Sequence, residues 1–204
     1  MRQLEGWKVA SVEGVCCGRI KDIYFDDGSW AITHALLFLF PGLSGPAEVL
    51  ARPEHFGRLD EQRAVLHLRL KQTEIAALPT VSSELPVCKQ YAALAFSARS
   101  PKAAATGMVG SNPRLRTAKA VTQYEINVRG EYGGTLEDLI FDKRSWQIRF
   151  LTIKQEIERK KLRFHILPQS VERFTWATQR LILRELQPVC LDGGGVLTDF
   201  STAA

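Results

Sequence analysis

The side chains that most often carry out chemistry are sparse in this sequence of 204 residues. Two of the four cysteines, Cys16 and Cys17, are adjacent, and the other two, Cys88 and Cys190, are remote. The sequence therefore has no C-x-x-C spacing for a metal or a redox pair. No two of the four histidines lie four residues apart, as two ligands on one helix face would. We predict no metal site and no cofactor.

Paired acids could serve as general acid and base, but the pairs here are neighbours in predicted strands. Asp26 precedes Asp27, and Glu137 precedes Asp138. Neighbouring side chains of a strand point to opposite faces and cannot share a proton. The sequence contains no nucleophile elbow, P-loop, dinucleotide fingerprint or His-Glu-x-x-His. The three glycines at 193–195 precede no helical pattern. We therefore predict that the protein is not an enzyme.

The net charge of +5 is concentrated in the middle of the chain. Residues 1–79 have a net charge of −1 and residues 121–204 a net charge of +1. The segment 80–120 has one acid and six basic residues, which are Lys89, Arg99, Lys102, Arg114, Arg116 and Lys119. Because both flanks are nearly neutral, the chain lacks the pattern of a globally basic nucleic-acid binder.

The composition is typical of a soluble globular protein, with 45% apolar and 24% charged residues. The longest apolar run, residues 35–40, ends at Pro41 and Gly42. It is far shorter than the roughly 20 residues of a membrane-spanning helix. The first six residues include charges where a signal peptide has its apolar stretch. We expect a cytoplasmic location with reduced cysteines and no transmembrane segment.

An internal repeat organises the elements that must position any functional group. Residues 14–36 align with residues 130–152 at an offset of 116, with eight identities in 23 positions. The identical pairs are Gly14/Gly130, Gly18/Gly134, Asp22/Asp138, Phe25/Phe141, Asp26/Asp142, Ser29/Ser145, Trp30/Trp146 and Ile32/Ile148. After the loss of one residue in a loop, Pro53 matches Pro168. The chain is therefore built from two copies of one unit.

Each copy is predicted to consist of short strands. In the first copy we expect strands at residues 14–26, from 30 onward, at 48–52 and at 65–70, with a hairpin turn at 25–28. The second copy has a turn at 142–145 and strands at 146–151, 163–167 and 181–184. A helix is expected at 72–78. Four or five strands in about 65 residues bury their faces by curling into a small barrel or sandwich.

The pattern divides the chain into four segments. We predict a first repeat at residues 1–79, a basic linker with Pro, Ser and Gly at 80–120, a second repeat at 121–190 and a glycine-rich tail at 191–204. A structureless join of about 40 residues is unusual within a compact unit. We therefore expect residues 88–96 to pack on a barrel through Tyr91, Leu94 and Phe96.

The repeated residues have structural interpretations. Gly18 and Gly134 lie inside strand patterns, where a bulge or a close backbone approach is expected. The repeated tryptophans are interpreted as core residues. The repeated acids Asp22 and Asp138 could accept hydrogen bonds from turn amides, or they could have a functional role. The sequence leaves both interpretations of the acids open.

The spacing of these residues resembles that of the PRC-barrel family. The first copy has the elements Leu4-x-Gly6, Gly14-x-x-x-Gly18-x-Ile20-x-Asp22-x-x-Phe25-Asp26 and Trp30-x-Ile32. The second copy has Tyr124-x-Ile126, Gly130, Gly134, Asp138, Phe141-Asp142 and Trp146. Residues 89–91 and 115–117 are similar to the joining region of bacterial tandem members. The resemblance implies a mainly β fold of two small PRC-type β-barrels in tandem, with short helical segments after the strands.

The family includes the cytoplasmic barrel of the photosynthetic reaction-centre H subunit and the C-terminal domain of a small-subunit ribosome maturation factor. The resemblance therefore implies a docking surface rather than a catalytic site. The first copy lacks the basic pair that usually follows the second strand and has an apolar loop at 39–43. Leu39, Phe40 and Leu43 are candidate contacts there, unless the loop packs over its own barrel.

Two binding functions follow from the resemblance. We favour a non-enzymatic interaction or scaffold module of a bacterial cytoplasm, which docks a protein partner. The alternative is an RNA- or ribosome-associated adaptor that uses Arg114, Arg116 and Lys119, although linkers are often basic for solubility alone. A role at a photosynthetic complex, with peripheral contact to a membrane complex, is a second alternative.

Self-association is also expected. Each barrel of about 65 residues buries only a modest fraction of its surface, so that a single copy is marginally stable. We therefore predict a homodimer, and we predict weak, salt-sensitive binding to nucleic acid.

Overall fold

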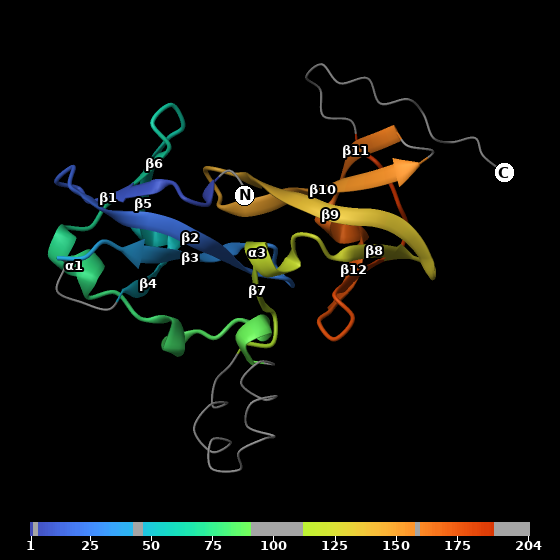
Figure 1. Cartoon of the computed structure of the whole chain (residues 1–204), viewed down its shortest axis with the longest axis horizontal. Helices are drawn as coiled ribbons and strands as arrows, with labels where there is room; N and C mark the ends of the chain where they lie inside the picture. The colour runs from blue at the N-terminus through green and yellow to red at the C-terminus, as the bar shows by residue number, and fades with distance from the viewer. Residues whose placement is uncertain (2–3, 43–46, 91–111, 158–159, 190–204) are drawn as a thin grey trace, which may run out of the picture. The chain divides into compact units, whose positions relative to one another are not determined.

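The computed structural model describes residues 1, 4–42, 47–90, 112–157 and 160–189 (Figure 1). These residues form a mainly β structure with two separate mixed sheets and a few short helices, which confirms the predicted fold class. The chain divides into two compact units. Unit 1 contains Met1–Val121 and Phe141–Ile148, and unit 2 contains Thr122–Ile140 and the residues from Arg149 onward.

The sheet of unit 1 has the strand order β4-β3-β2-β1-β6-β5, and a seventh strand, β7, pairs with β2. The pairing of β1 with β6 is parallel, and the other pairings are antiparallel. Its strands are β1 (Lys8–Ala10), β2 (Cys16–Asp26), β3 (Ile32–Leu39), β4 (Glu48–Ala51), β5 (Phe56–Asp60), β6 (Val65–Leu68) and β7 (Leu115–Thr117). The short helices are η2 (Pro53–His55), α1 (Gln72–Ala76), η3 (Val81–Ser83) and α3 (Ala118–Val121).

The second sheet repeats this order strand for strand, as β11-β10-β9-β8-β13-β12. The parallel pair is here β8 with β13, in the place of β1 with β6. Its elements are β8 (Glu125–Val128), β9 (Glu131–Asp142), β10 (Gln147–Ile157), β11 (Lys160–Ile166), η5 (Pro168–Ser170), β12 (Val171–Thr175) and β13 (Arg180–Leu183). Within the described residues the pairings of each sheet follow an open path, and we therefore refer to sheets rather than closed barrels.

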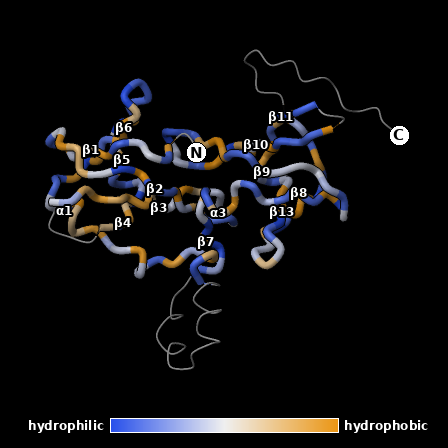
Figure 2. The backbone as a smooth tube through the Cα atoms, viewed as in Figure 1, coloured by the Kyte–Doolittle hydropathy of each residue, from blue (hydrophilic) through white to orange (hydrophobic). Residues whose placement is uncertain are grey.

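The core of unit 1 lies against β2, β3 and β4. Residues 34–37 of β3 are all buried. In Figure 2, β3 and β4 contain hydrophobic stretches, whereas the turn between β5 and β6 is hydrophilic. Tyr24, Leu36 and Leu50 form one buried cluster with Leu115, against which Val81 packs. Two residues of the predicted linker are therefore part of this core or lie directly on it.

The described parts of the predicted linker belong to unit 1. β7 runs antiparallel to the end of β2, with Thr117 opposite Tyr24. Thr80 forms a bridge with Val49 on β4, and residues 87–90 are helical. The predicted packing of Tyr91, Leu94 and Phe96 falls outside the described residues. The limits of the two repeats at 79/80 and 120/121 stay predictions.

Candidate functional site

The repeated glycines allow two strands to approach closely in each sheet. A Cβ at Gly18 would lie 2.2 Å from the carbonyl oxygen of Phe38, and a Cβ at Gly134 would lie 2.7 Å from that of Lys154. Gly134 also has a φ of +119°. The register shifts next to both glycines, between residues 9 and 10 and between residues 126 and 127. The predicted bulge and close approach are thereby confirmed.

The repeated acids bind backbone amides. The Asp22 carboxylate accepts from the amides of Ile23 at 2.8 Å and Lys119 at 3.0 Å, and Asp138 accepts from Leu139 at 2.7 Å. Burial raises the pKa of Asp22, although the hydrogen bonds from Lys119 and Ile23 act in the opposite direction. These bonds favour the structural interpretation, with strand and linker amides in place of the expected turn amides.

The second repeated acid pair stabilises the hairpin turns. Asp26 accepts from the amides of Gly28 and Ser29, at 3.0 and 2.8 Å. Asp142 accepts from the Arg144 amide at 3.0 Å and from the Ser145 hydroxyl at 2.7 Å. Each aspartate thus satisfies the donors of the turn that follows its strand.

The tryptophans correct the expectation of core residues. Trp30 and Trp146 are half-buried, and their φ values of 58° and 54° place them in the left-handed turn after the strand. Trp30 stacks on Phe25 with centroids 5.9 Å apart, and Trp146 stacks on Phe141 at 5.5 Å. A side chain that starts from a turn covers the edge of the hydrophobic core. The two tryptophans therefore lie at the margin of the core and not at its centre.

The two tryptophan turns are joined within unit 1. The Ile32 amide donates to the Trp146 carbonyl, and the Ile148 amide donates to the Trp30 carbonyl, both at 2.8 Å. The two hydrogen bonds are equivalent in the repeat, because Ile148 corresponds to Ile32 and Trp146 corresponds to Trp30 at the offset of 116. The turn at 141–148 therefore completes unit 1 through a reciprocal pair of backbone hydrogen bonds between equivalent residues of the two copies.

The apolar loop divides into a buried and an exposed part. Leu39 is 4% exposed, and it lies opposite Gly18 at the end of β3. It is therefore a core residue, which corrects its assignment as a contact. Phe40 is 37% exposed, and Leu43 lies outside the described residues.

Five exposed large hydrophobic side chains of the described residues lie at corresponding ends of the two sheets. In unit 1 they are Val12 and Val15, in the turn before β2, and Phe40 after β3, whose amide donates to the Cys17 carbonyl at the start of β2. In unit 2 they are Tyr132 at the start of β9 and Ile157 at the end of β10. We call these two groups the hairpin-end surfaces.

Only one further large hydrophobic residue of the described chain, Leu167, is exposed. It follows β11 and lies outside the hairpin-end surface of unit 2. The hairpin-end surfaces therefore hold five of the six exposed large hydrophobic residues in the described ranges.

Two of the three candidate linker cations are held by acids of unit 1. Arg116 donates to Asp27 at 2.6 Å, and the two side chains are only 13% and 14% exposed. Lys119 pairs with Glu5 at 2.5 Å. The third cation, Arg114, lies against the backbone at Gly28, where a Cβ would be 2.5 Å from its guanidinium. Arg116 and Lys119 thus have intramolecular partners, which weakens the interpretation of this segment as an RNA contact.

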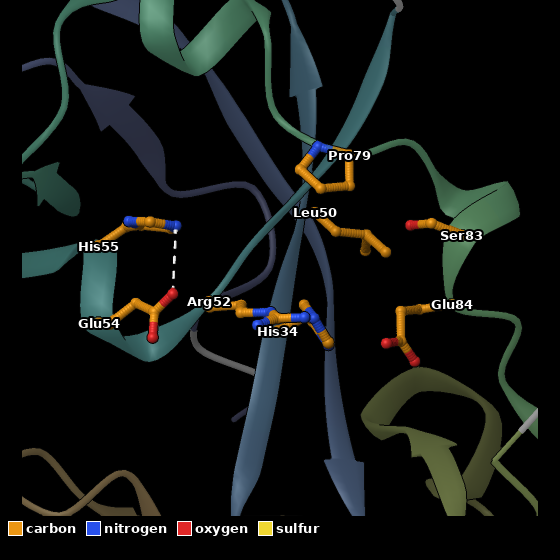
Figure 3. Close-up of a pocket in the computed structure, with 8 residues that line it drawn as sticks. All are labelled: His34, Leu50, Arg52, Glu54, His55, Pro79, Ser83 and Glu84. Atoms are coloured by element: carbon orange, nitrogen blue, oxygen red, sulfur yellow. Dashed lines mark ion pairs between the residues drawn. The ribbon is translucent and has the colours of Figure 1, made fainter.

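Sequence reasoning missed a pocket in unit 1 (Figure 3). Its volume is about 340 Å³, and its walls come from β3, β4, η2, η3 and the segments beside them. The lining residues are His34, Leu50, Arg52, Glu54, His55, Pro79, Ser83 and Glu84. They are spread over residues 34–84 and show no motif spacing, so no signal in the sequence identifies them.

His34 is the most buried ionisable residue of this pocket, with 7% of its surface exposed. Burial lowers its pKa; Glu84 opposes this shift and Arg52 adds to it. Its Nδ1 atom is buried without a hydrogen-bond partner, and so is the hydroxyl of Tyr24, whose ring meets the imidazole edge-on at 6.5 Å. His34 is therefore a neutral imidazole at neutral pH.

Other chemistry is not assembled in the described part of the chain. No group of three or more His, Cys, Asp or Glu residues there could hold a metal ion, and no helix there is long and apolar enough to cross a membrane. No protein-family model matches the sequence, and no curated protein matches it. The resemblance to PRC-barrels therefore rests on the repeated residues quoted above.

Proposed function

We propose that the protein is a non-enzymatic interaction module of the PRC-barrel type, which docks a protein partner in the cytoplasm. The observation that carries this proposal is the gathering of exposed hydrophobic side chains on the hairpin-end surfaces. Scattered exposed hydrophobic residues are ordinary, whereas a group at one place in the fold marks an interaction site. Here the group occurs at the same place in both units.

The framework of each sheet holds these side chains in position. The close approach at Gly18 sets β2 against β3, so that the turn with Val12 and Val15 lies at the same end as Phe40. In unit 2 the close approach at Gly134 sets β9 against β10, so that Tyr132 and Ile157 lie at the same end of the sheet. Loops carried on a rigid sheet are a common location for binding residues.

The first partner to test is a second copy of this chain. We expect light scattering at micromolar concentration to give twice the chain mass of 22.9 kDa. Phe40→Asp should return the mass to that of one chain, because a carboxylate would have to be buried in the interface. Leu39 is unsuitable for this test, since its burial makes Leu39→Asp a folding defect.

Leu167→Asp is the matched control, because Leu167 is similarly exposed but lies outside the hairpin-end surfaces. An interface elsewhere would leave the mass unchanged by Phe40→Asp. If the wild-type chain is monomeric, the partner is another protein. Capture from the native organism should then lose one protein with Phe40→Asp and keep it with Leu167→Asp. Equal capture by both variants contradicts the proposal.

A direct test separates this function from an RNA adaptor. Because Arg116 and Lys119 are already paired, few cations of the described linker remain to neutralise phosphates. We expect weak binding to generic RNA that disappears between 50 and about 200 mM salt and shows no sequence preference. Tight, sequence-selective binding at about 200 mM salt would favour the adaptor instead.

A further inference from the structure

The pocket of unit 1 contains two opposite charges without ion-pair partners. Arg52 follows β4, and Glu84 follows η3 on another wall (Figure 3). Among the described residues, neither side chain forms a salt bridge, whereas the neighbouring Glu54 lies 3.7 Å from His55 and forms an ion pair with it when that imidazole is protonated. One cation and one anion thus face the same space and remain available to a ligand.

His34 adds a hydrogen-bond donor to this space. Only its Nδ1 is both buried and without a partner, so Nε2 is the ring nitrogen that solvent in the pocket reaches. A buried N–H without an acceptor is rarer and costlier than a carbonyl-type lone pair without a donor. The proton of the neutral ring therefore belongs on Nε2, and this N–H points its donor to the pocket.

Two apolar residues also line the pocket, and its volume limits the size of a ligand. Leu50 and Pro79 lie on one side of the space in Figure 3, and Ser83 adds a hydroxyl group to the lining. A volume of about 340 Å³ is near the lower end of the range of small-molecule sites, about 300 to 1,000 Å³. The pocket therefore suits a small molecule with an anionic group, a cationic group and an apolar portion.

We propose that this pocket binds a free α-amino acid with an apolar side chain. Arg52 and the Nε2–H of His34 donate to the carboxylate of the ligand, Glu84 accepts from its ammonium group, and its side chain lies against Leu50 and Pro79. A guanidinium is well suited to a carboxylate because its donors match both oxygens. This site is independent of the hairpin-end surfaces, so either proposal can fail without the other.

Calorimetry with L-leucine and two analogues tests the proposal on the full chain. L-Leucinamide lacks the carboxylate, and N-acetyl-L-leucine lacks the ammonium group. We expect L-leucine to bind at least tenfold more tightly than either analogue, because each analogue leaves one charge of the pocket unpaired. Inorganic phosphate serves as a probe for simple anion binding.

Two variants test which side chain of the pocket contacts the carboxylate of the ligand and which contacts its ammonium group. Arg52→Leu should weaken L-leucine about tenfold and leave L-leucinamide unchanged, and Glu84→Gln should weaken L-leucine and leave N-acetyl-L-leucine unchanged. Both side chains lack ion-pair partners in the described chain, so these variants should stay folded, which circular dichroism checks. His34→Phe should block all the ligands.

Three outcomes would overturn the proposal. These are no detectable heat with millimolar L-leucine, equal affinity for L-leucine and both analogues, and phosphate binding that exceeds L-leucine binding. Loss of affinity in Arg52→Leu for every ligand alike would also count against it, since that variant should discriminate between ligands with and without a carboxylate.

Discussion

Unit 1 and unit 2 share one strand order, but they differ in the side chains that this framework carries. Where unit 1 has His34, Arg52 and His55 around its pocket, the repeat places Phe150, Leu167 and Ser170 in the second copy. Phe150 there contacts the ring of His165, with centroids 6.4 Å apart. The difference teaches that glycines and aspartates set the backbone, whereas a few other positions set the chemistry.

A second difference concerns the hairpin turns. At the position after the repeated aspartate, the first copy has Asp27 and the second copy has Lys143. Asp27 is held in a nearly buried pair with Arg116 of β7, whereas Lys143 pairs with Glu61 on an exposed surface. The same turn therefore serves as the attachment point of the linker in one copy and as an ordinary surface turn in the other.

The largest loss of stability is expected at the repeated glycines, where the neighbouring strand approaches the backbone closely in both copies. Gly18→Ala should destabilise unit 1 by more than about 3 kcal/mol, because the new Cβ would overlap the Phe38 carbonyl. Gly134→Ala should destabilise unit 2 by a similar amount, with added strain from its positive φ. Chemical denaturation monitored by hydrogen exchange would assign each loss to its unit.

Gly14→Ala is the control for that experiment. A Cβ at Gly14 meets no atom within 4 Å, so the cost is limited to its φ of +80°, about 1 kcal/mol. Equal effects of Gly14→Ala and Gly18→Ala would contradict the close approach.

Most strands could be predicted because their patterns are local. The expected segments correspond to β2, β3, β4, β6, β10, β11 and β13, and the expected helix to α1. The short strands β1, β5, β7, β8 and β12 were missed, since three to five residues carry too little alternation and depend on their neighbours for pairing. The parallel pairing of β1 with β6 is likewise a property of the tertiary fold.

The site was much less predictable than the fold. The roles of Gly18 and Gly134 follow from their positions in a strand pattern, but the half-burial of Trp30 depends on a positive φ that tryptophan rarely adopts. The inclusion of residues 141–148 in unit 1 and the assembly of the pocket are long-range events. Neither leaves a periodic or spaced signal in the sequence.

The second largest effect is expected for the tryptophans. Trp30→Ala and Trp146→Ala should each cost about 3 kcal/mol, because each indole stacks on the repeated phenylalanine of its own copy. Thermal denaturation would measure both losses, and a loss below about 1 kcal/mol in either variant would show that this stacking contributes little to stability.

The comparison of the two turns predicts a smaller effect. Asp27→Ala should destabilise the protein by about 2 kcal/mol, because it leaves Arg116 partly buried without its partner. Lys143→Ala, at the same turn position in the second copy, should change stability by less than about 0.5 kcal/mol. Urea denaturation checks both. A loss in Lys143→Ala as large as that in Asp27→Ala would remove the distinction between the two turns.

The smallest effect concerns pH. Burial lowers the pKa of His34 in unit 1 and of His165 in unit 2, so the unfolded chain binds more protons near the ordinary histidine pKa of about 6.5. The contribution of these two histidines to the free energy of unfolding should therefore be fully present above that pH. It should decrease as the pH falls toward the pKa values that the histidines have in the folded protein. The charged groups that act on His34 are Glu84, Arg52 and Glu54.

His34→Phe introduces the phenylalanine that the second copy has at the equivalent position. It should remove the part of the pH dependence of stability that comes from His34 and leave the part that comes from His165. NMR titration of the histidine rings should give two midpoints below 6.5 in the wild-type chain. A midpoint for His34 above 6.5 would show that Glu84, and not burial, determines its charge.

Because residues 141–148 belong to unit 1, the assembly of this unit depends on the order of synthesis. The partners Ile32 and Trp146 are separated by more than 100 residues, and at about 5 to 20 residues per second a ribosome needs roughly 6 to 23 s to supply the second turn. During that interval the backbone groups beside Trp30 lack their partners, and such edges are templates for pairing with other nascent chains. The second copy supplies these partners when it emerges, so this part of unit 1 completes its backbone hydrogen bonds only after residue 148 has been synthesised.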